Sequence, residues 1–366
     1  MKASKNMIIT SEQVGKGHPD KICDQVSDYI LTKILKQDKD ARVAVESAIG
    51  KGKLFITGEV TTSFDYQIGL QEEIKSLLVD IDIDYNDFEI ELNISKQSPE
   101  INSKVDAEEI GAGDQGLMFG YATSETKSML PIPFDLSNQL IKAYENKLAS
   151  QSEDFKFDSK AQVCYDYTNK RLVNINMSVQ HSKDISLEDL RTKLTTLINE
   201  VVSEFEKEND FSIMDSNTEL IINNAGSFIL GGAIADSGLT GRKIIADTYG
   251  GLGRHGGGAF SGKDYTKVDR SAAYYARFVA KSIIKRGLAD IAEIQVSYII
   301  GQTHPVSIFI ETFGTNISTL DEIMDFVNEN FDFRLGNIIA ELDLKNIDYT
   351  KTTLYGHFSK NDLPWE

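Results

Sequence analysis

Residues 236–270 of this 366-residue chain read DSGLTGRKIIADTYGGLGRHGGGAFSGKDYTKVDR, and this stretch decides how the rest is interpreted. Seven glycines fall between Gly250 and Gly262. Glycine costs backbone entropy in a helix or strand, so this density indicates a backbone that approaches a ligand closely. The stretch also carries six cations, namely Arg242, Lys243, Arg254, Lys263, Lys267 and Arg270. Exposed backbone donors with converging Lys and Arg are typical of a polyphosphate site.

A flexible basic surface loop is the alternative interpretation of residues 236–270. A bare linker would lack the aromatic and small apolar residues of Thr-Tyr-Gly-Gly and Gly-Ala-Phe. The stretch is not a Walker A loop, because G-x-x-x-x-G-K-[ST] is absent. We therefore favour a polyphosphate site of another kind.

The composition bounds the classes of protein that are possible. The length allows two or three domains. A formal net charge of −18 argues against nucleic-acid and anionic-membrane partners. The local surplus of Lys and Arg in 236–270 is opposite in sign to this net charge. Two cysteines cannot build a disulfide framework or a cysteine-based zinc site. The first residues lack an apolar signal region and no apolar run could span a bilayer, so we expect a cytoplasmic protein.

The sequence GHPDK at 17–21 predicts the start of a helix. Pro19 suits the first helical position, which places His18 at the cap and Asp20 in the first turn. An amphipathic helix follows, because apolar residues recur every four positions at Ile22, Val26, Ile30 and Ile34. Asp20 is either an ordinary first-turn acid or a ligand of a hard divalent cation, and the residues alone leave both open.

Alternation of apolar residues predicts a hairpin of strands 42–48 and 54–61 around Gly50-Lys51-Gly52. Glu46 and Glu59 then lie on the faces opposite the apolar residues. Acids at such positions are usually only exposed to solvent, and Asp158 with Lys160 in FKFDSK also reads as surface charge.

Strands and one long amphipathic helix occur in each third of the chain. The long helices are expected at 66–81, 187–205 and 320–330. Further strands are expected at 88–94, 163–167, 173–179, 219–223, 293–300 and 306–313, and further helices at 136–148, 272–284 and 334–342. Residues 96–110 read as a loop. This pattern permits three similar α+β sections without requiring them.

Three blocks of sequence carry a family resemblance. They are GHPDK at 17–21, GAGDQG at 111–116, and GLTGRKIIADTYGG followed by RHGGGAFSGKD within 238–264. Together, and in this order, they resemble the S-adenosylmethionine synthetases (methionine adenosyltransferases), with similarity from about residue 8 to 366. The resemblance implies an α+β fold of three similar sections of mixed or antiparallel sheet in a pseudo-threefold arrangement. It implies domains at 4–101, 112–226 and 228–366, with a mobile gating loop at 97–110.

The resemblance also implies a reaction. The methionine sulfur attacks C5′ of ATP, and the released triphosphate is hydrolysed to phosphate and pyrophosphate. Two Mg²⁺ ions per site and K⁺ are the implied cofactors. The implied assembly is a homodimer with shared active sites, often paired into a homotetramer.

Site residues follow from the matching positions. The implied catalytic residues are His18, Lys160, Arg242 and Lys263. The implied ATP contacts are His18, Asp158, Ser159, Lys160, Ser227, Phe228, Asp236, Arg242, Lys243, Ala259 and Lys263. The implied methionine contacts are Glu59, Gln97, Asp114, Asp236 and Lys267. Asp20 is the implied Mg²⁺ ligand and Glu46 the implied K⁺ ligand. His357 near the terminus is expected to be structural.

Three features depart from the family pattern. Gly15-Lys16 stands where Ser or Thr and then Glu are expected, Ser227 replaces an Arg, and the loop after Gln97 is about three residues shorter. Two other functions therefore stay open. One is a different ATP-dependent transferase or triphosphatase, and the other is a non-catalytic nucleotide-binding regulator. An assay with ATP, with and without methionine, separates these readings.

Overall fold

The order of elements repeats along the chain in the computed structural model, which describes residues 7–96 and 110–366. Each repeat runs strand, helix, hairpin, helix, and the first two repeats add a last strand. The first comprises β1 (Ile8–Val14), α1 (Pro19–Gln37), β2 (Arg42–Gly50), β3 (Lys53–Thr61), α2 (Leu70–Ile81) and β4 (Glu89–Ser95). The second comprises β5 (Gly116–Thr123), α4 (Ile132–Tyr144), β6 (Phe155–Asp166), β7 (Arg171–His181), α5 (Leu187–Asn209) and β8 (Glu219–Ile222). The third comprises β9 (Gly238–Leu239), α8 (Val268–Lys285), β10 (Ile291–Tyr298), β11 (Ser307–Glu311) and α9 (Leu320–Asn330).

Short elements connect or follow these repeats. They are η1 (Ile83–Asp87), η2 (Glu145–Ala149), α6 (Gly232–Ala235), α7 (Ile244–Asp247), α10 (Leu335–Glu341), η3 (Leu344–Asn346) and η4 (Tyr349–Lys351). The predicted α+β class with three similar sections is confirmed. No helix within the described ranges is both long and apolar enough to cross a membrane.

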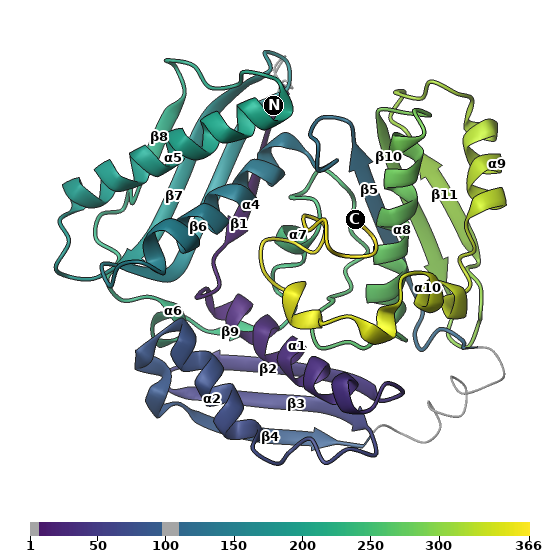
Figure 1. Cartoon of the computed structure of the whole chain (residues 1–366), viewed down its shortest axis with the longest axis horizontal. Helices are drawn as coiled ribbons and strands as arrows, with labels where there is room; N and C mark the ends of the chain where they lie inside the picture. The colour runs from purple at the N-terminus through teal and green to yellow at the C-terminus, as the bar shows by residue number, and fades with distance from the viewer. Residues whose placement is uncertain (1–6, 97–109) are drawn as a thin grey trace, which may run out of the picture.

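The opening strand of each repeat joins the sheet of another repeat (Figure 1). The sheet orders are β1-β6-β7-β8, β11-β10-β5 and β4-β3-β2-β9. Strand β1 therefore lies in the second sheet, β5 in the third, and β9 in the first, which closes a cycle. The exchanged strands pair antiparallel, whereas β3–β4 and β7–β8 are parallel pairs. Strands that are far apart in the sequence are therefore hydrogen-bonded to one another.

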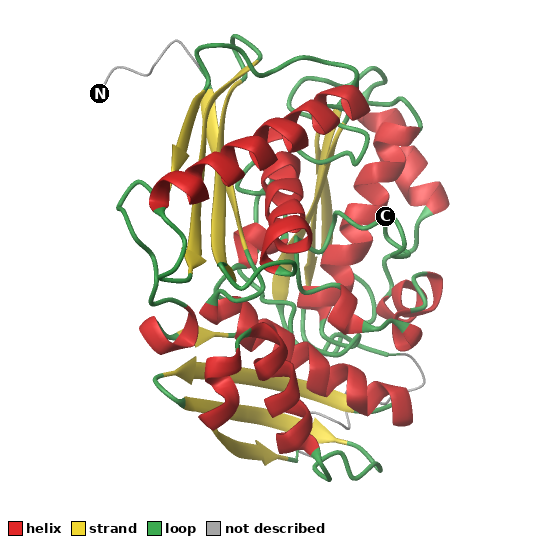
Figure 2. Cartoon of the chain, turned by 60° about the vertical axis from the view of Figure 1, so that its left-hand side comes forward, coloured by secondary structure: helices red, strands yellow, loops and turns green. Residues whose placement is uncertain are grey.

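Helices cover one face of each sheet and leave much of the other uncovered (Figures 1 and 2). Helices α1 and α2 lie over the first sheet, α4 and α5 over the second, and α8 over the third. In β2 the buried Val43 and Val45 face the helices, while Glu46 is exposed. Period-two alternation of the strand explains this division.

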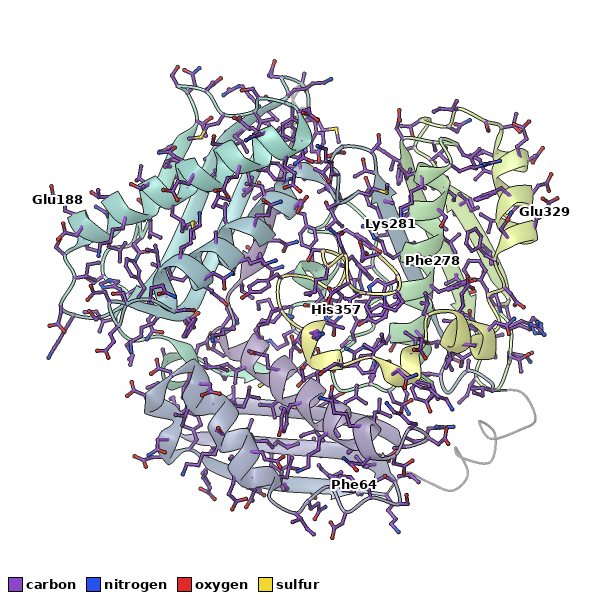
Figure 3. The ribbon with its side chains drawn as sticks, viewed as in Figure 1. Phe64, Glu188, Phe278, Lys281, Glu329 and His357 are labelled. Carbon is purple, nitrogen blue, oxygen red and sulfur yellow. The ribbon has the colours of Figure 1, made fainter. Side chains whose placement is uncertain are left out.

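Two hydrophobic cores result. The second repeat has its own core, with Leu140, Ile175, Leu194 and Ile198 fully buried. The first and third repeats share one core, which the C-terminal segment closes. Trp365 is fully buried and stacks on Tyr274 with ring centroids 3.9 Å apart. His357, near the centre of Figure 3, is also buried and hydrogen-bonds Tyr274 Oη at 2.7 Å, as expected of a structural residue.

Several predicted boundaries moved. The helix expected at 66–81 begins only at Leu70, because Gly69 before it has a left-handed φ of 71°. The helix expected at 136–148 starts at Ile132 and ends in a π turn at 145–149. The expected strands do not include Ile8–Val14, which form β1 and pair with β6 far along the chain. Strand β6 begins at Phe155, before the strand expected at 163–167.

Candidate active site

A cluster of charge lies at the N-terminus of α1. Pro19 opens the helix, and His18 is its cap, with Nδ1 accepting the N–H of Asp20 at 3.2 Å. The Asp20 side chain is only 2 % exposed and contacts Lys243 Nζ at 2.5 Å and Arg242 Nε at 3.5 Å. The N–H of Leu239 donates to it at 2.9 Å. The structure therefore brings together four predicted site residues that the sequence separates by more than 200 positions.

These neighbours set the protonation of the cluster. Burial, together with a smaller effect of the positive charges of Lys243 and Lys160, lowers the pKa of His18 to about 4, although the charge of Asp20 opposes this shift. Burial opposes the Asp20 carboxylate, but hydrogen bonds from Lys243 and Leu239 outweigh it and hold the pKa of Asp20 below its usual value. His18 is thus neutral near pH 7. Because its Nδ1 accepts a hydrogen bond, the ring proton lies on Nε2, which can donate.

The strand β6 places a second carboxylate beside this cluster. Asp158 accepts the N–H of Gly232 at 2.7 Å, and burial, with a smaller contribution from the charge of Asp236, raises the pKa of Asp158 to about 6. Asp236 itself is exposed. Lys160, two residues along β6, pairs with Glu12 Oε1 at 3.0 Å in an exposed ion pair. The predicted D-x-K pair therefore faces the same region as His18.

A second cluster follows the glycine-rich segment. Lys263 Nζ contacts Asp269 at 2.6 Å, and Lys267 Nζ contacts the fully buried Asp264 at 2.7 Å. Burial opposes the Asp264 carboxylate, but the charge of Lys267 and its hydrogen bonds hold the pKa of Asp264 below its usual value. Val43 of β2 donates its N–H to Asp264 at 2.6 Å. This segment is thereby fixed along β2 of the first sheet.

Two predicted methionine contacts lie near this second cluster. Ala44 of β2 pairs with Glu59 of β3 on one side and bridges Lys263 on the other, so all three share a row across the sheet. Asp114 is exposed in the loop before β5. A Cβ built on Gly116, two residues later, would lie 3.8 Å from Asp269 Oδ1, which brings that loop beside the cluster.

Other predicted residues have different surroundings. Ser159 is buried, so its side chain faces the interior rather than a ligand. Ser227 is exposed, and Phe228 is half-buried with its backbone held by His181. Ala259 packs beside Gly241. Glu46 stands exposed on β2, and Gln97, with most of the predicted gating loop, lies outside the described residues.

The carboxylates of the site region are spread apart. Within residues 7–96 and 110–366, no three His, Cys, Asp or Glu side chains gather closely enough to hold an ion by themselves. Mg²⁺ is commonly held by one or two carboxylates together with substrate phosphates. Asp20 at a helix N-terminus, flanked by two cations that favour phosphate, fits that mode. Glu46 offers an exposed oxygen ligand for K⁺ on the sheet face.

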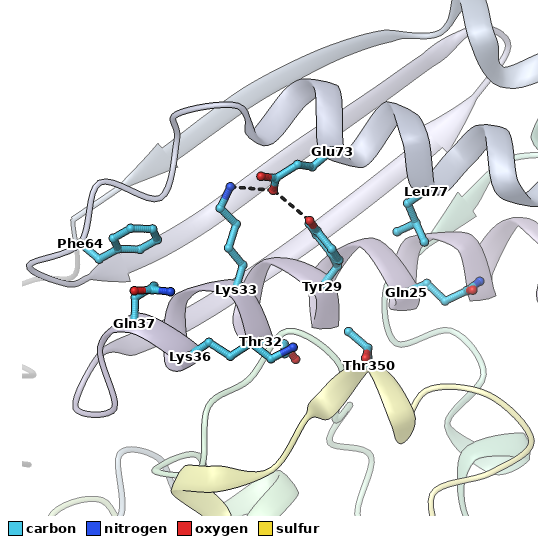
Figure 4. A pocket seen from close by; sticks show the side chains of 10 residues that line it. All are labelled: Gln25, Tyr29, Thr32, Lys33, Lys36, Gln37, Phe64, Glu73, Leu77 and Thr350. Atoms are coloured by element: carbon cyan, nitrogen blue, oxygen red, sulfur yellow. Dashed lines mark hydrogen bonds and ion pairs between the residues drawn. The ribbon is translucent and has the colours of Figure 1, made fainter.

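The cavity in Figure 4 lies elsewhere, between α1 and α2. It measures about 570 Å³ and contains none of the predicted site residues. Its charged side chains are already satisfied, because Glu73 accepts from Lys33 at 2.6 Å and from Tyr29 at 2.9 Å. This cavity therefore does not mark the proposed site.

Comparison with known proteins gives matches along nearly the whole chain. Three domain models match in sequence order: S-adenosylmethionine synthetase, N-terminal domain (residues 6–107), central domain (109–228) and C-terminal domain (230–366). The chain belongs to the S-adenosylmethionine synthetase family. It is 47 % identical to the S-adenosylmethionine synthase of Mesoplasma florum, over 98 % of this chain and 97 % of that protein. It is 46 % identical to that of Mycoplasmopsis pulmonis (98 % and 96 % covered) and 43 % identical to that of Finegoldia magna (99 % and 97 %).

One departure from the S-adenosylmethionine synthetase pattern now has a structural account. Lys16 Nζ lies 3.7 Å from the ring centroid of Phe157, a cation–π contact on the strand that carries Asp158. Its backbone N–H donates to Glu145 at 2.6 Å, and its carbonyl accepts from Gln25 at 2.8 Å. The Lys16 side chain is engaged with Phe157. Nothing in the structure explains Ser227.

Sequence reasoning missed three carboxylates of the site region. Asp269 is the partner of Lys263, while Asp24 and Asp28 lie fully buried on α1. One signal was available, because Asp20, Asp24 and Asp28 recur every four residues on a helix. This row lies on the face of α1 opposite to Val26 and Ile30, so it indicates buried partners only if that face of the helix is covered as well.

Proposed function

We propose that this chain forms S-adenosyl-L-methionine from ATP and L-methionine and then hydrolyses the triphosphate to phosphate and pyrophosphate. The observation that carries the proposal is the cluster of His18, Asp20, Arg242 and Lys243 in a chain that is 47 % identical, along nearly its whole length, to a named synthase. The reacting sulfur is already a nucleophile, so no protein nucleophile is needed. The demands on the protein are alignment and stabilisation of the leaving charge.

The chemical step is a displacement at C5′, in which one bond to this carbon forms as another breaks. The sulfur lone pair forms the S–C5′ bond while the C5′–O bond breaks and its electrons leave on the triphosphate. Arg242, Lys243, Lys160 and Lys263 would neutralise that charge. Neutral His18 would donate its Nε2–H to the oxygen that leaves C5′, and Asp236 would contact both substrates. Mg²⁺ held by Asp20 would supply further neutralisation of the phosphates, and K⁺ would be held by Glu46.

Substrate positioning is proposed for the remaining residues. Asp158 and the backbone around Ser159, Ser227, Phe228 and Ala259 would hold the nucleotide. Glu59 would bind the methionine ammonium as an ion pair. Asp114, Lys267 and Gln97 would complete the methionine site.

The decisive experiment mixes the protein with ATP, methionine, Mg²⁺ and K⁺ and searches for the sulfonium product by mass. Absence of that product, or phosphate release that ignores methionine, would overturn the proposal. Lys263→Ala should keep the fold and lower turnover by roughly 10²–10³-fold, the range for a residue that stabilises developing charge. Lys33→Ala is the matched control, because Lys33 also pairs with a carboxylate at 2.6 Å but lies by the cavity of Figure 4. Near wild-type turnover in Lys263→Ala would remove Lys263 from the site.

We further propose that two copies share their sites as a homodimer. Apolar side chains stand exposed on strands of the first and third sheets, including Leu117, Leu239 and Phe309. A face of this kind favours association with a second copy. His18→Ala and Lys263→Ala proteins should each have strongly reduced turnover, and mixing them should restore activity if the two clusters meet across the interface. A mixture that exchanges subunits yet stays inactive would show that each site belongs to one chain.

A further inference from the structure

Three carboxylates on one face of α1 each hold a backbone N–H of the stretch 236–270. They lie four residues apart, so they form a single row along the helix. Each residue is at most 1 % exposed. The pairs are Asp20 with the N–H of Leu239 at 2.9 Å, Asp24 with that of Gly241 at 2.8 Å, and Asp28 with that of Gly262 at 2.8 Å. A charged acceptor makes each bond stronger than a neutral one.

Two of the three bonded residues directly precede cations of the proposed site. Gly241 comes before Arg242, and Gly262 comes before Lys263. A bond to the preceding N–H fixes where the cationic side chain leaves the backbone. Helix α1 thus sets the spacing of cations that the loop alone could not hold, because glycine-rich segments have many accessible conformations.

Gly241 and Gly262 have left-handed backbone conformations, and each lies too close to a neighbouring residue to carry a side chain. Gly241 has a φ of 78°, and a Cβ there would lie 2.4 Å from the Cβ of Ala259. Gly262 has a φ of 79°, and a Cβ there would lie 1.9 Å from the carbonyl oxygen of Val45. Both conformations favour glycine. Because glycine has no side chain, α1 can hold these two positions only by hydrogen bonds to their backbone N–H groups.

Asp24 differs from its neighbours in the row because it has no access to a ligand. Its second oxygen lies 3.0 Å from Nζ of Lys21, which is itself fully buried and bonds Asp247 and the carbonyl of Thr353. Asp20, by contrast, contacts the cations directly, and Asp28 forms a two-pronged pair with Arg270. Asp24 can therefore act on a substrate only indirectly, either through Gly241 and the residue after it or through Lys21.

We propose that Asp24 is a positioning residue, which orients Arg242 toward the triphosphate by holding the N–H of Gly241. This rests on the proposed function, in which Arg242 neutralises the leaving group. A cation displaced by about 1 Å can cost roughly 10²-fold in rate. The side chain of Asp24 itself touches neither substrate nor metal in this account.

A double-mutant cycle tests the proposal, with Asp24→Asn and Arg242→Ala made singly and together. Asp24→Asn should lower kcat about 10-fold to 10²-fold, with the KM for methionine unchanged. In the Arg242→Ala background the same change should cost less than about threefold, because residues that act as a unit are not additive. Equal costs in the two backgrounds would show that Asp24 is merely structural and would overturn the proposal.

Controls separate failure of this inference from failure of the proposed function. If Arg242→Ala keeps wild-type turnover, the site assignment is wrong, whatever Asp24 does. Lys33→Ala, elsewhere on α1, should leave kcat unchanged. If Asp24→Asn does not fold, Thr240→Val takes its place in the cycle, because Thr240 Oγ1 ties the same segment to Ser27 of α1 at 2.8 Å and to the N–H of Ser47 at 2.9 Å. Additive costs for Thr240→Val would then overturn the proposal.

Discussion

The two cores of this molecule are built in different ways. The core of the second repeat is packed between α4, α5 and its sheet, and among the described residues this repeat buries three acids, Asp135, Glu145 and Asp166, and no Lys or Arg. The core shared by the first and third repeats is crossed by buried charges, including Lys21, Asp24, Asp28, Asp247 and Arg270. Those charges connect α1, α8 and the C-terminal segment to the glycine-rich stretch.

The difference shows where stability and function are joined. Apolar packing is non-directional, so it tolerates small shifts of one element against another. A buried ion pair is directional and costly to leave unmatched. The shared core therefore fixes orientation as well as proximity, and it lies beneath the proposed site. Three substitutions can break or sharpen this contrast.

The largest effect is expected from Arg270→Met in the shared core. Arg270 is 1 % exposed and donates to both oxygens of Asp28, at 2.7 and 2.9 Å. Removing it leaves a buried carboxylate unpaired, which should lower the free energy of unfolding by about 3–5 kcal/mol in a urea titration. Asp28→Leu added to it should recover part of that loss. A loss below about 1 kcal/mol would mean that the charges of the shared core do not hold it together.

Leu194→Ala should have a somewhat smaller effect in the core of the second repeat. Leu194 is fully buried on α5, and deleting its side chain should cost about 3 kcal/mol from lost burial and the cavity left behind. Turnover per folded molecule should not change, because α5 supplies none of the proposed site residues. Thr196→Ala, exposed on the same helix, should change the unfolding free energy by less than about 0.5 kcal/mol. Reduced turnover in folded Leu194→Ala would contradict the separation of the two cores.

The smallest effect concerns a carboxylate at the margin of the second core. Burial raises the pKa of Asp135 to about 6, although Ser128 donates to it at 2.6 Å. The folded state therefore binds the proton more tightly than the unfolded state, so this stability is present at low pH and is lost as the pH rises through 6. Between pH 4.5 and 7, wild type should lose about 1–2 kcal/mol more than Asp135→Asn does. Parallel pH profiles of the two proteins would refute the shift.

Much of the fold could be predicted because it is local. Helix α1 follows from the four-residue spacing of Ile22 and Val26, and β2 and β3 follow from their alternation around a glycine turn. The exchange of β1, β5 and β9 could not be predicted. Each pairs with a strand far along the chain, and the two residues of β9 have no periodicity to detect.

The site divides in the same way. Motif resemblance identified His18, Asp20, Arg242 and Lys243, and the structure places them together. The acids that hold the loops were not found, because a buried Asp and a solvent-facing Asp on a helix look alike in sequence. Ser159 is a different case, since this residue between two predicted contacts is buried and could meet a nucleotide only through its backbone. Whether such a side chain is buried or exposed depends on the segment that packs against it, and the sequence does not identify that segment.

The cyclic exchange of strands has a consequence for synthesis on the ribosome. Ile9 of β1 pairs with Tyr165, so the first strand emerges long before its neighbour exists. The first sheet likewise waits for Leu239 before its edge is complete. Unmatched strand edges in a nascent chain are prone to pair with other chains. Newly made copies of this protein should therefore depend on chaperones until residues beyond 240 have been translated.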